Sequence, residues 1–323
     1  MTARPEPRAG RPAIEVEHLR KIYPGGVEAV AGISFDVEPG EVFGLLGPNG
    51  AGKSTTIGML TTTVAPTAGV ARVAGFDVVG SPLAVRRASA VVFQEAVVDR
   101  SLTGRRNLEI HARLWGIPAS GAAARVCDVS ERFGVADLLD RPVATYSGGE
   151  RRRLEIARSL VSRPRVLFLD EPTVGLDPRI RHELLDVIAS LRSRDEMTII
   201  LTTHYLDEAE RLCDRIAIVH AGRIVALDTP RALLDALGHE IVEFRVGDDA
   251  DAGSVLTSLR ARRVAGEGAF AVGTTVTVPL TGQSSADVLG AVADLGAVLA
   301  STTTRAPTLD DVYLRLTGGR LAA

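Results

Sequence analysis

The chain has 323 residues, enough for two domains of ordinary size. Hydrophobic residues make up 46% of it and charged residues 24%, a balance that suits a globular protein and excludes a largely disordered or fibrous one. The 37 basic and 40 acidic residues give a net charge of -3, so no overall field draws the chain to nucleic acid or anionic lipid. We therefore expect no nucleic-acid partner.

The N-terminal segment and the two cysteines indicate a cytosolic chain. Residues 1–13 carry three prolines and three arginines without an apolar period, so we expect a disordered tail, no signal peptide, and order from about Ile14. No apolar run reaches the length of about 18 residues that a transmembrane helix needs. Cys127 and Cys213 stand far apart without a CxxC spacing, which disfavours a zinc site or a disulfide scaffold and favours two buried thiols.

Short β-rich runs alternate with helical patterns along the first two thirds of the chain. Several of these runs are continuously apolar, which is typical of parallel strands buried on both faces. This alternation predicts an α/β fold with a mostly parallel sheet covered by helices. The predicted strands are residues 14–19, 41–47, 89–94, 166–170, 197–204 and 215–220, and predicted helices begin near Lys53 and span about 178–194.

Two regions depart from this alternation. Between about 95 and 164 helical patterns dominate, which predicts an all-helical subdomain within a main domain at 14–230. The composition changes again after 230, and we assign 231–323 to a small α+β domain. Its predicted elements are strands at 240–246, 269–273 and 275–280, a helix from Ser284–Ser285 to about Leu299, and a last helix capped by Thr308.

A glycine-rich segment follows the apolar run at 41–47 and precedes a helix. It fits the P-loop pattern, in which backbone N–H groups surround a phosphate at a helix N-terminus. Lys53 would reach the terminal phosphates of a nucleotide, and the Ser54 hydroxyl would hold Mg²⁺. A chance glycine turn would not explain why one of only two lysines stands here. The predicted phosphate-binding residues are Gly47, Pro48, Asn49, Gly50, Ala51, Gly52, Lys53, Ser54 and Thr55.

Two carboxylates end the apolar run at 166–170. Asp170 at the strand end would orient the Mg²⁺ shell, and Glu171 would polarise the water that attacks the γ-phosphate. A polar strand terminus is the commoner explanation for such a pair when it stands alone. The P-loop in the same α/β body favours the catalytic interpretation.

Further motifs stand in a fixed order around these residues. Tyr146-Ser147-Gly148-Gly149-Glu150 precedes the helical pattern RRRLEIARSL. With the P-loop, it resembles an ATP-binding-cassette (ABC) nucleotide-binding subunit, whose signature is commonly LSGGQ; Tyr146 and Glu150 depart from that signature. The resemblance spans about 14–230. It extends to four further positions, Gln94 of the Q-loop, Asp177 of the D-loop, His204 of the switch and Tyr23, the aromatic that stacks on adenine.

The resemblance implies a fold, a site and partners. The fold is a P-loop NTPase cassette with an antiparallel β portion at the N-terminus, beside the parallel sheet and the helical subdomain. Catalysis would use Glu171, His204 and Gln94, and Mg²⁺ would be held by Ser54, Gln94 and Asp170. ATP would bind the P-loop and Tyr23. The nucleotide of a second subunit would be contacted by Ser147, Gly148, Gly149 and Asp177. The resemblance favours a homodimer.

Several segments further resemble the daunorubicin/doxorubicin-resistance type of ATP-binding subunit. These are residues 72–79, 102–118 and PTLDDVYLRLTG at 307–318. That type implies an ATPase bound to the cytoplasmic side of the membrane, driving a separate permease that exports a hydrophobic drug or lipid-like compound. The alternative is a soluble cassette ATPase that acts on ribosomes or DNA. Such relatives usually carry two cassettes, a long coiled coil or Cys clusters, and this sequence shows one cassette and two unpaired cysteines. The 231–323 domain would serve assembly or regulation, or only add stabilising bulk.

Overall fold

The computed structural model describes residues 11–95, 97–195, 197–247, 249–280 and 282–318. The chain divides into two compact units, which meet between Ile224 and Val225. This division falls inside strand β10 (Arg223–Asp228), ahead of the predicted boundary at 230. Residues 1–10 of the predicted tail lie outside the described residues.

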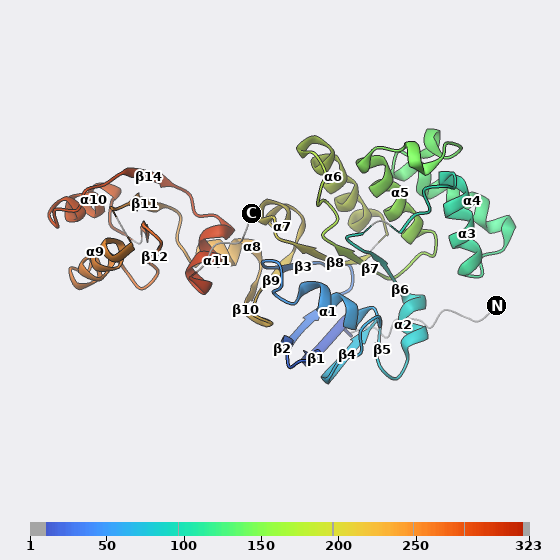
Figure 1. Ribbon diagram of the computed structural model, residues 1–323, viewed down its shortest axis with the longest axis horizontal. Coiled ribbons are helices and arrows are strands. Elements are labelled where there is room, and N and C mark those ends of the chain that lie inside the picture. Colours follow the sequence, from blue (N-terminus) through green and yellow to red (C-terminus); the bar gives the residue numbers. More distant parts are fainter. Residues whose placement is uncertain (1–10, 96, 196, 248, 281, 319–323) are drawn as a thin grey trace. The chain divides into compact units, whose positions relative to one another are not determined.

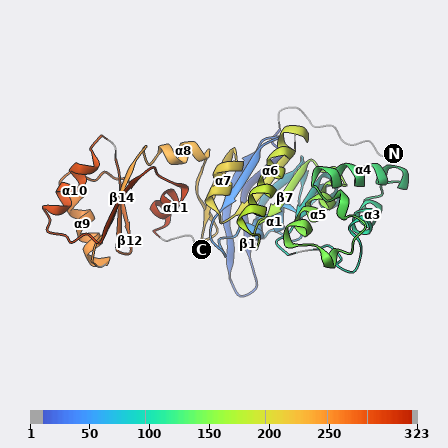
Figure 2. The same ribbon diagram turned by 90° about the horizontal axis from the view of Figure 1, so that it is seen from above.

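The first unit is built on a six-stranded sheet, and helices α6 (Pro178–Asp195) and α7 (Leu206–Leu212) lie over one of its faces (Figure 1, Figure 2). Strands β3, β6, β7, β8 and β9 pair in parallel, and β3, β7 and β8 are buried along their whole length. Helices on both faces exclude water from these strands, which explains their unbroken apolar runs. In spatial order the strands are β10 (Arg223–Asp228), β9 (Arg215–His220), β3 (Val42–Leu46), β8 (Thr198–Thr203), β7 (Val166–Asp170) and β6 (Ser89–Val92).

A second, antiparallel sheet in this unit confirms the predicted N-terminal β portion. Its strands alternate buried and exposed residues more than those of the parallel sheet, as one-sided packing requires. In spatial order they are β2 (Glu28–Val37), β1 (Ile14–Ile22), β4 (Ala68–Val73) and β5 (Phe76–Asp77).

Helices complete the first unit, and the helical region lies together in Figure 1 as the green part of the chain. The predicted all-helical insert is confirmed as a helical region. It holds α3 (Gly104–Leu114), α4 (Ala119–Arg132), α5 (Gly148–Leu160) and the short 3₁₀ turns η1 (Ala136–Leu138) and η2 (Val143–Thr145). The other helices are α1 (Lys53–Leu60), α2 (Pro82–Ala88), α6 (Pro178–Asp195) and α7 (Leu206–Leu212).

The second unit is a four-stranded antiparallel sheet with helices. One face of the sheet packs Val242, Phe244 and Val276 against α9 and α10 to form a core of its own. In spatial order the strands are β12 (Phe270–Val272), β13 (Thr275–Pro279), β11 (Ile241–Arg245) and β14 (Ser301–Arg305). The helices are α8 (Pro230–Asp235), α9 (Asp249–Ala261), α10 (Ser285–Ala293) and α11 (Leu309–Thr317).

Two expectations were wrong in detail, and one strand was missed. The helix predicted to reach Leu299 ends at Ala293, because Gly296 with φ 70° takes a left-handed conformation that stops a helix. The strand β14 that follows was not expected. Cys213 is buried, but Cys127 is exposed, since it stands one position past the buried Val126 of α4 and points to solvent.

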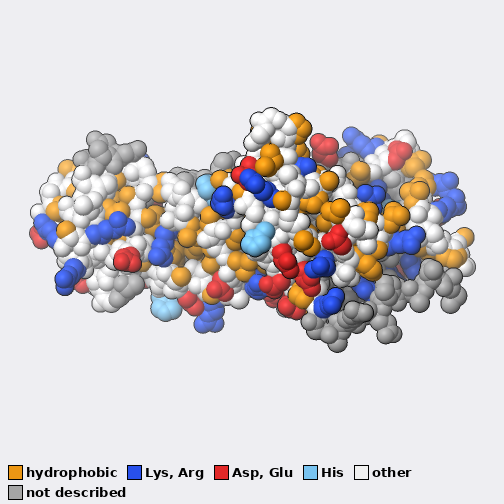
Figure 3. Space-filling view, turned by 90° about the horizontal axis from the view of Figure 1, so that it is seen from below, with side chains coloured by type: hydrophobic (Ala, Val, Ile, Leu, Met, Phe, Trp, Pro, Cys, Tyr) orange, Lys and Arg blue, Asp and Glu red, His pale blue; other side chains and the backbone are white. Residues whose placement is uncertain are grey.

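The surface carries both signs of charge. On the face drawn in Figure 3, basic, acidic and hydrophobic side chains are interspersed. Among the described residues, no helix has the length and apolar character needed to cross a membrane.

Candidate active site

The P-loop connects β3 to α1. Gly50 and Gly52 have φ values of 80° and 105°, which favour glycine. A Cβ atom at Gly52 would come within 2.3 Å of the Ala29 carbonyl oxygen, and one at Gly47 within 2.3 Å of the Val219 carbonyl oxygen. The loop therefore needs glycine for its conformation and for its packing, and it leads directly into the N-terminus of α1, where an anion is stabilised.

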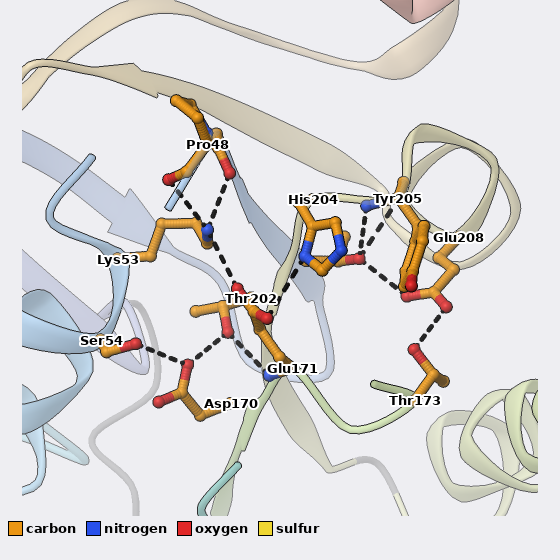
Figure 4. Close-up of polar contacts among 12 residues, drawn as sticks. Pro48, Lys53, Ser54, Asp170, Glu171, Thr173, Thr202, His204, Tyr205 and Glu208 are labelled. Carbon is orange, nitrogen blue, oxygen red and sulfur yellow. Dashed lines mark hydrogen bonds and ion pairs between the residues drawn. The ribbon is translucent and has the colours of Figure 1, made fainter. Parts of the chain in front are cut away.

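Lys53 is buried at the start of α1. Its Nζ donates hydrogen bonds to the carbonyl oxygens of Gly47 at 2.7 Å and Pro48 at 3.2 Å. The same atom lies 3.1 Å from Oε1 of Glu171 (Figure 4). The Lys53 ammonium is thus held by the P-loop carbonyl groups, beside the Glu171 carboxylate that follows β7.

Asp170 joins the P-loop helix to the end of β7. Its Oδ1 accepts hydrogen bonds from Ser54 Oγ at 3.1 Å and from Thr202 Oγ1 at 2.6 Å. Hydroxyl and carboxylate oxygens are the hard donors that Mg²⁺ prefers, and Mg²⁺ commonly takes one or two protein ligands beside substrate phosphates. Ser54 and Asp170 fit that role. Sequence reasoning missed Thr202, which ends the apolar run of β8 with a polar group.

Glu171 lies between Lys53 and His204. Its Oε1 faces Lys53, and its Oε2 lies 3.2 Å from His204 Nδ1, close enough for an electrostatic contact but without hydrogen-bonding geometry. Its backbone N–H donates to Thr202 Oγ1 at 2.9 Å. Glu171 holds a φ of 46°, a left-handed conformation that costs a non-glycine residue about 1–3 kcal/mol. The fold therefore imposes this orientation on the carboxylate.

Two predicted residues stand apart from this cluster. Gln94 is exposed beyond the end of β6, and in the described part of the chain no contact joins it to Ser54 or Asp170. Tyr23 is half-buried beyond the end of β1, with Lys21 Nζ 5.1 Å from its ring centre. Both therefore remain predictions as ligands.

The signature segment forms the N-terminus of α5. Ser147 Oγ accepts from the Glu150 N–H at 3.2 Å, while Glu150 Oε2 accepts from the Ser147 N–H at 2.7 Å, a capping box. That backbone hydrogen bond holds the pKa of the Glu150 carboxyl below its usual value. A Cβ atom at Gly149 would come within 2.3 Å of Ile180 Cγ2. Glu150 thus completes a helix cap, and Gly149 allows α5 to approach α6.

Tyr146 and Asp177 also have structural roles at this end of the unit. Tyr146 is buried, and its hydroxyl donates a hydrogen bond to the Leu138 carbonyl oxygen. Burial raises the pKa of that hydroxyl. Asp177 precedes α6, and its Oδ1 accepts from the Ile180 N–H at 3.0 Å. The departure from leucine at Tyr146 therefore anchors the signature to the helical region.

Arg152, which sequence reasoning missed, connects α5 with the end of β7. Its buried guanidinium donates to the carbonyl oxygens of Phe93 at 2.6 Å and Pro172 at 2.8 Å, and pairs with Glu155 at 3.0 Å. Glu155 in turn accepts from the Val97 N–H at 3.1 Å. One helix thus holds both sides of the segment that contains Gln94.

A family model described as ABC transporter matches residues 30–174. The daunorubicin/doxorubicin resistance ATP-binding protein DrrA of Streptomyces peucetius is 48% identical over 236 residues, 73% of this chain and 71% of that protein. The chain belongs to the ATP-binding subunits of ABC transporters. It is accordingly an ABC transporter ATPase subunit, close to the DrrA proteins, and ATP is its nucleotide.

Two further likenesses extend this assignment within the ABC family. The Nod factor export ATP-binding protein I of Ralstonia nicotianae is 39% identical over 313 residues, 95% of this chain and 94% of that protein. Among solved structures, cbiO1 from Clostridium perfringens, part of the ABC transporter complex cbiONQ, superposes with a TM-score of 0.65 and 27% identity. That match covers 79% of this chain and 97% of the other.

Proposed function

We propose that this ABC subunit powers export of a hydrophobic compound through a separate membrane permease, from the cytoplasmic face of the membrane. One observation carries the energetic half of the proposal: the Glu171 carboxylate is fixed between Lys53 and His204 at the P-loop. The similarity to DrrA, 48% over 236 residues, supports the transport half.

The geometry supports a division of labour among these residues. Glu171 acts as the base that polarises the attacking water, and His204 beside it holds the γ-phosphate and the water in register. Lys53 binds the terminal phosphates together with the loop N–H groups. Ser54 and Asp170, with Gln94, hold Mg²⁺, which when bound neutralises charge that develops on the phosphate oxygens.

A second subunit completes the site in this proposal. Ser147 accepts the Glu150 N–H through its oxygen, so its hydroxyl proton remains available for a phosphate. Together with Gly148 and Gly149 at the N-terminus of α5, it offers donors to the nucleotide of a partner cassette. We propose a homodimer in which Asp177 lies at the same interface and Tyr23 stacks on adenine. ATP closes the dimer, and hydrolysis reopens it.

The permease, rather than this chain, would select the compound that is transported. The names of the relatives mention daunorubicin and doxorubicin in one case and Nod factor in the other. We propose a hydrophobic compound of the drug or lipid-like class, because selectivity among such compounds requires a cavity in the membrane partner.

Capture from membranes tests this proposal. Tagged protein is recovered from gently solubilised membranes of its host, and ATPase activity is measured alone and after capture. We expect a multi-spanning partner that changes the ATPase rate, and vesicles with both subunits should move daunorubicin only with ATP. Recovery of ribosomes or nucleic acid without a membrane protein would support the soluble cassette instead. A captured permease that moves only a lipid-linked saccharide would exclude drug export.

A further inference from the structure

A buried carboxylate outside the predicted site connects the two segments that carry Glu171 and His204. Glu208 on α7 is fully buried, with 0% of its surface exposed. Its Oε1 accepts from Thr173 Oγ1 at 2.5 Å, and its Oε2 accepts from Thr203 Oγ1 at 2.8 Å (Figure 4). Arg181 Nε of α6 lies 2.8 Å from Oε1. Both oxygens are therefore engaged, and the charge is paired with the half-buried guanidinium of Arg181, which also pairs with Asp207.

The Thr203 contact reaches His204. The Thr203 hydroxyl donates to Glu208 and also accepts from the Tyr205 N–H at 2.9 Å, so it fixes the backbone on both sides of His204. The His204 ring packs against the Tyr205 ring with 4.2 Å between centres, and the Arg181 guanidinium lies 4.1 Å from the Tyr205 ring centre. The direction of the His204 ring thus depends on groups that Glu208 holds.

The Thr173 contact reaches Glu171 from the other segment. Thr173 follows Glu171 by two residues, and the Val174 N–H donates to the Glu171 carbonyl oxygen at 3.3 Å to close a turn. The Leu176 N–H donates to the Thr173 carbonyl oxygen at 3.2 Å in the same turn. Glu208 therefore holds the chain immediately after Glu171 as well as the chain immediately before His204.

We propose that Glu208 is a positioning residue of the ATPase site, which sets the spacing between the Glu171 carboxylate and the His204 imidazole. It touches neither reacting group and acts through Thr173 and Thr203. This inference rests on the roles proposed above for Glu171 and His204. An apolar side chain could fill the same volume with less loss of hydration, so the charge is explained by the two hydroxyls that donate to it and by the guanidinium paired with it.

The first test compares two substitutions on α7. Glu208→Gln keeps the shape but loses the charge and one acceptor oxygen. We expect kcat for ATP to fall about 10- to 100-fold, because small misplacements of catalytic groups have effects of this size, while KM changes less than about twofold. Glu210→Gln, at an exposed position of the same helix, should leave both constants unchanged. Unchanged kcat in folded Glu208→Gln protein would overturn the inference.

A second test asks whether Glu208 acts through His204. In a His204→Ala background, Glu208→Gln should lower kcat by a smaller factor than in the wild type, because one of the two groups that Glu208 positions is gone. A drop as large as in the wild type would overturn the proposed route. If His204→Ala and Glu171→Gln themselves kept full turnover, the proposed function would fail at its site. If only Glu208→Gln kept full turnover, the present inference alone would fail.

A third test does not depend on the fold tolerating Glu208→Gln. Thr203→Val removes the hydroxyl at nearly constant volume, and Thr203→Ser restores it. We expect the valine variant to lose kcat without a change in KM, and the serine variant to recover most of the wild-type value. Thermal melting of both variants identifies any loss of folded protein. Equal turnover of folded valine and serine variants would overturn the inference.

Discussion

The two units of this chain differ in how many charged side chains they bury and in where these lie. Among the described residues, the second unit buries one charged side chain, Asp311. The first unit buries several, and most of them lie where the parallel strands end: Glu41, Lys53, Arg152, Glu155, Asp170, Glu171 and Glu208. Removing a charge from water costs free energy that a fold recovers only with paired partners. In the first unit most of the buried charges gather around the proposed ATPase site, whereas the one in the second unit caps a helix.

Asp311 illustrates the structural use of a buried charge. Its carboxylate accepts from Arg305 at 2.7 and 2.8 Å and from the Thr308 N–H at 2.8 Å, which caps α11. Burial raises its pKa, but the hydrogen bonds from Arg305 and Thr308 outweigh burial and hold the pKa below its usual value. Arg305 also pairs with Glu243 at 2.8 Å. This network ties β11, β14 and α11 together.

The largest effect is expected at Glu171. Glu171→Gln keeps the shape but removes the base, so kcat should fall about 10²- to 10⁴-fold while ATP affinity is preserved. Single-turnover hydrolysis and equilibrium nucleotide binding measure the two quantities separately. The matched Glu210→Gln variant should hydrolyse at the wild-type rate. Normal turnover in Glu171→Gln would refute the assignment of the base.

The next effect is expected at Lys53. Lys53→Ala removes charge-assisted hydrogen bonds worth about 1.5–3 kcal/mol, so ATP should bind about 10- to 150-fold more weakly. Lys53→Arg keeps the charge but places a guanidinium fork in a loop shaped for an ammonium, and it should also weaken binding. Titration with a fluorescent ATP analogue gives both affinities. Unchanged affinity in the alanine variant would contradict the phosphate cradle.

A smaller and different effect is expected at Asp311. Asp311→Asn should lower the free energy of unfolding of the second unit by about 1–3 kcal/mol, because it weakens a buried cap and an ion pair. Basal ATPase activity should not change. Chemical unfolding followed beside ATPase activity separates the two, and the exposed Asp310→Asn should cost less than about 0.5 kcal/mol. A large loss of basal turnover in Asp311→Asn would end the distinction between the units.

The smallest effect concerns pH. Burial, with a contribution from the charge of Arg158, lowers the pKa of His111 from 6.5 to about 4. Between pH 6.5 and about 4, His111 therefore binds a proton in the unfolded chain but not in the folded chain. The free energy of unfolding falls as pH drops through this range, by at most about 1.4 kcal/mol per pH unit.

Urea unfolding at pH 7 and pH 5 measures this dependence. His111→Leu removes the titrating group at similar volume, so its stability should fall less between the two pH values than that of the wild type. All other ionisable groups are common to both proteins. Equal losses would show that His111 is not protonated selectively in the unfolded chain.

The sequence predicted elements best where burial dictates the pattern. Strands β7 and β9 begin and end at the predicted residues, since each is a buried apolar run ended by a polar residue. Strand β14 could not be predicted, because its sequence STTTR has almost no buried residue and it forms by pairing with β11. Its strand state depends on a partner far away in the chain.

The residues of the candidate site likewise divide into those that the sequence predicts and those that it does not. Motif spacing identified Lys53, Ser54, Asp170, Glu171 and His204, and the structure brings these five together. Motif spacing did not identify the residues that hold these five in place. Thr202, Glu208 and Arg152 act across contacts between separate segments, and no local spacing marks such contacts.

Helix α5 has a mechanical consequence. It begins at the Ser147 cap and, about 12 Å further along its axis, Glu155 holds the Val97 N–H. Arg152 on the same helix holds the Phe93 carbonyl oxygen. A helix is a stiff rod, so in the proposed dimer a displacement of its cap would be transmitted to the chain that follows β6, at Phe93 and Val97. Force can therefore travel from the cap to the Gln94 segment along one lever.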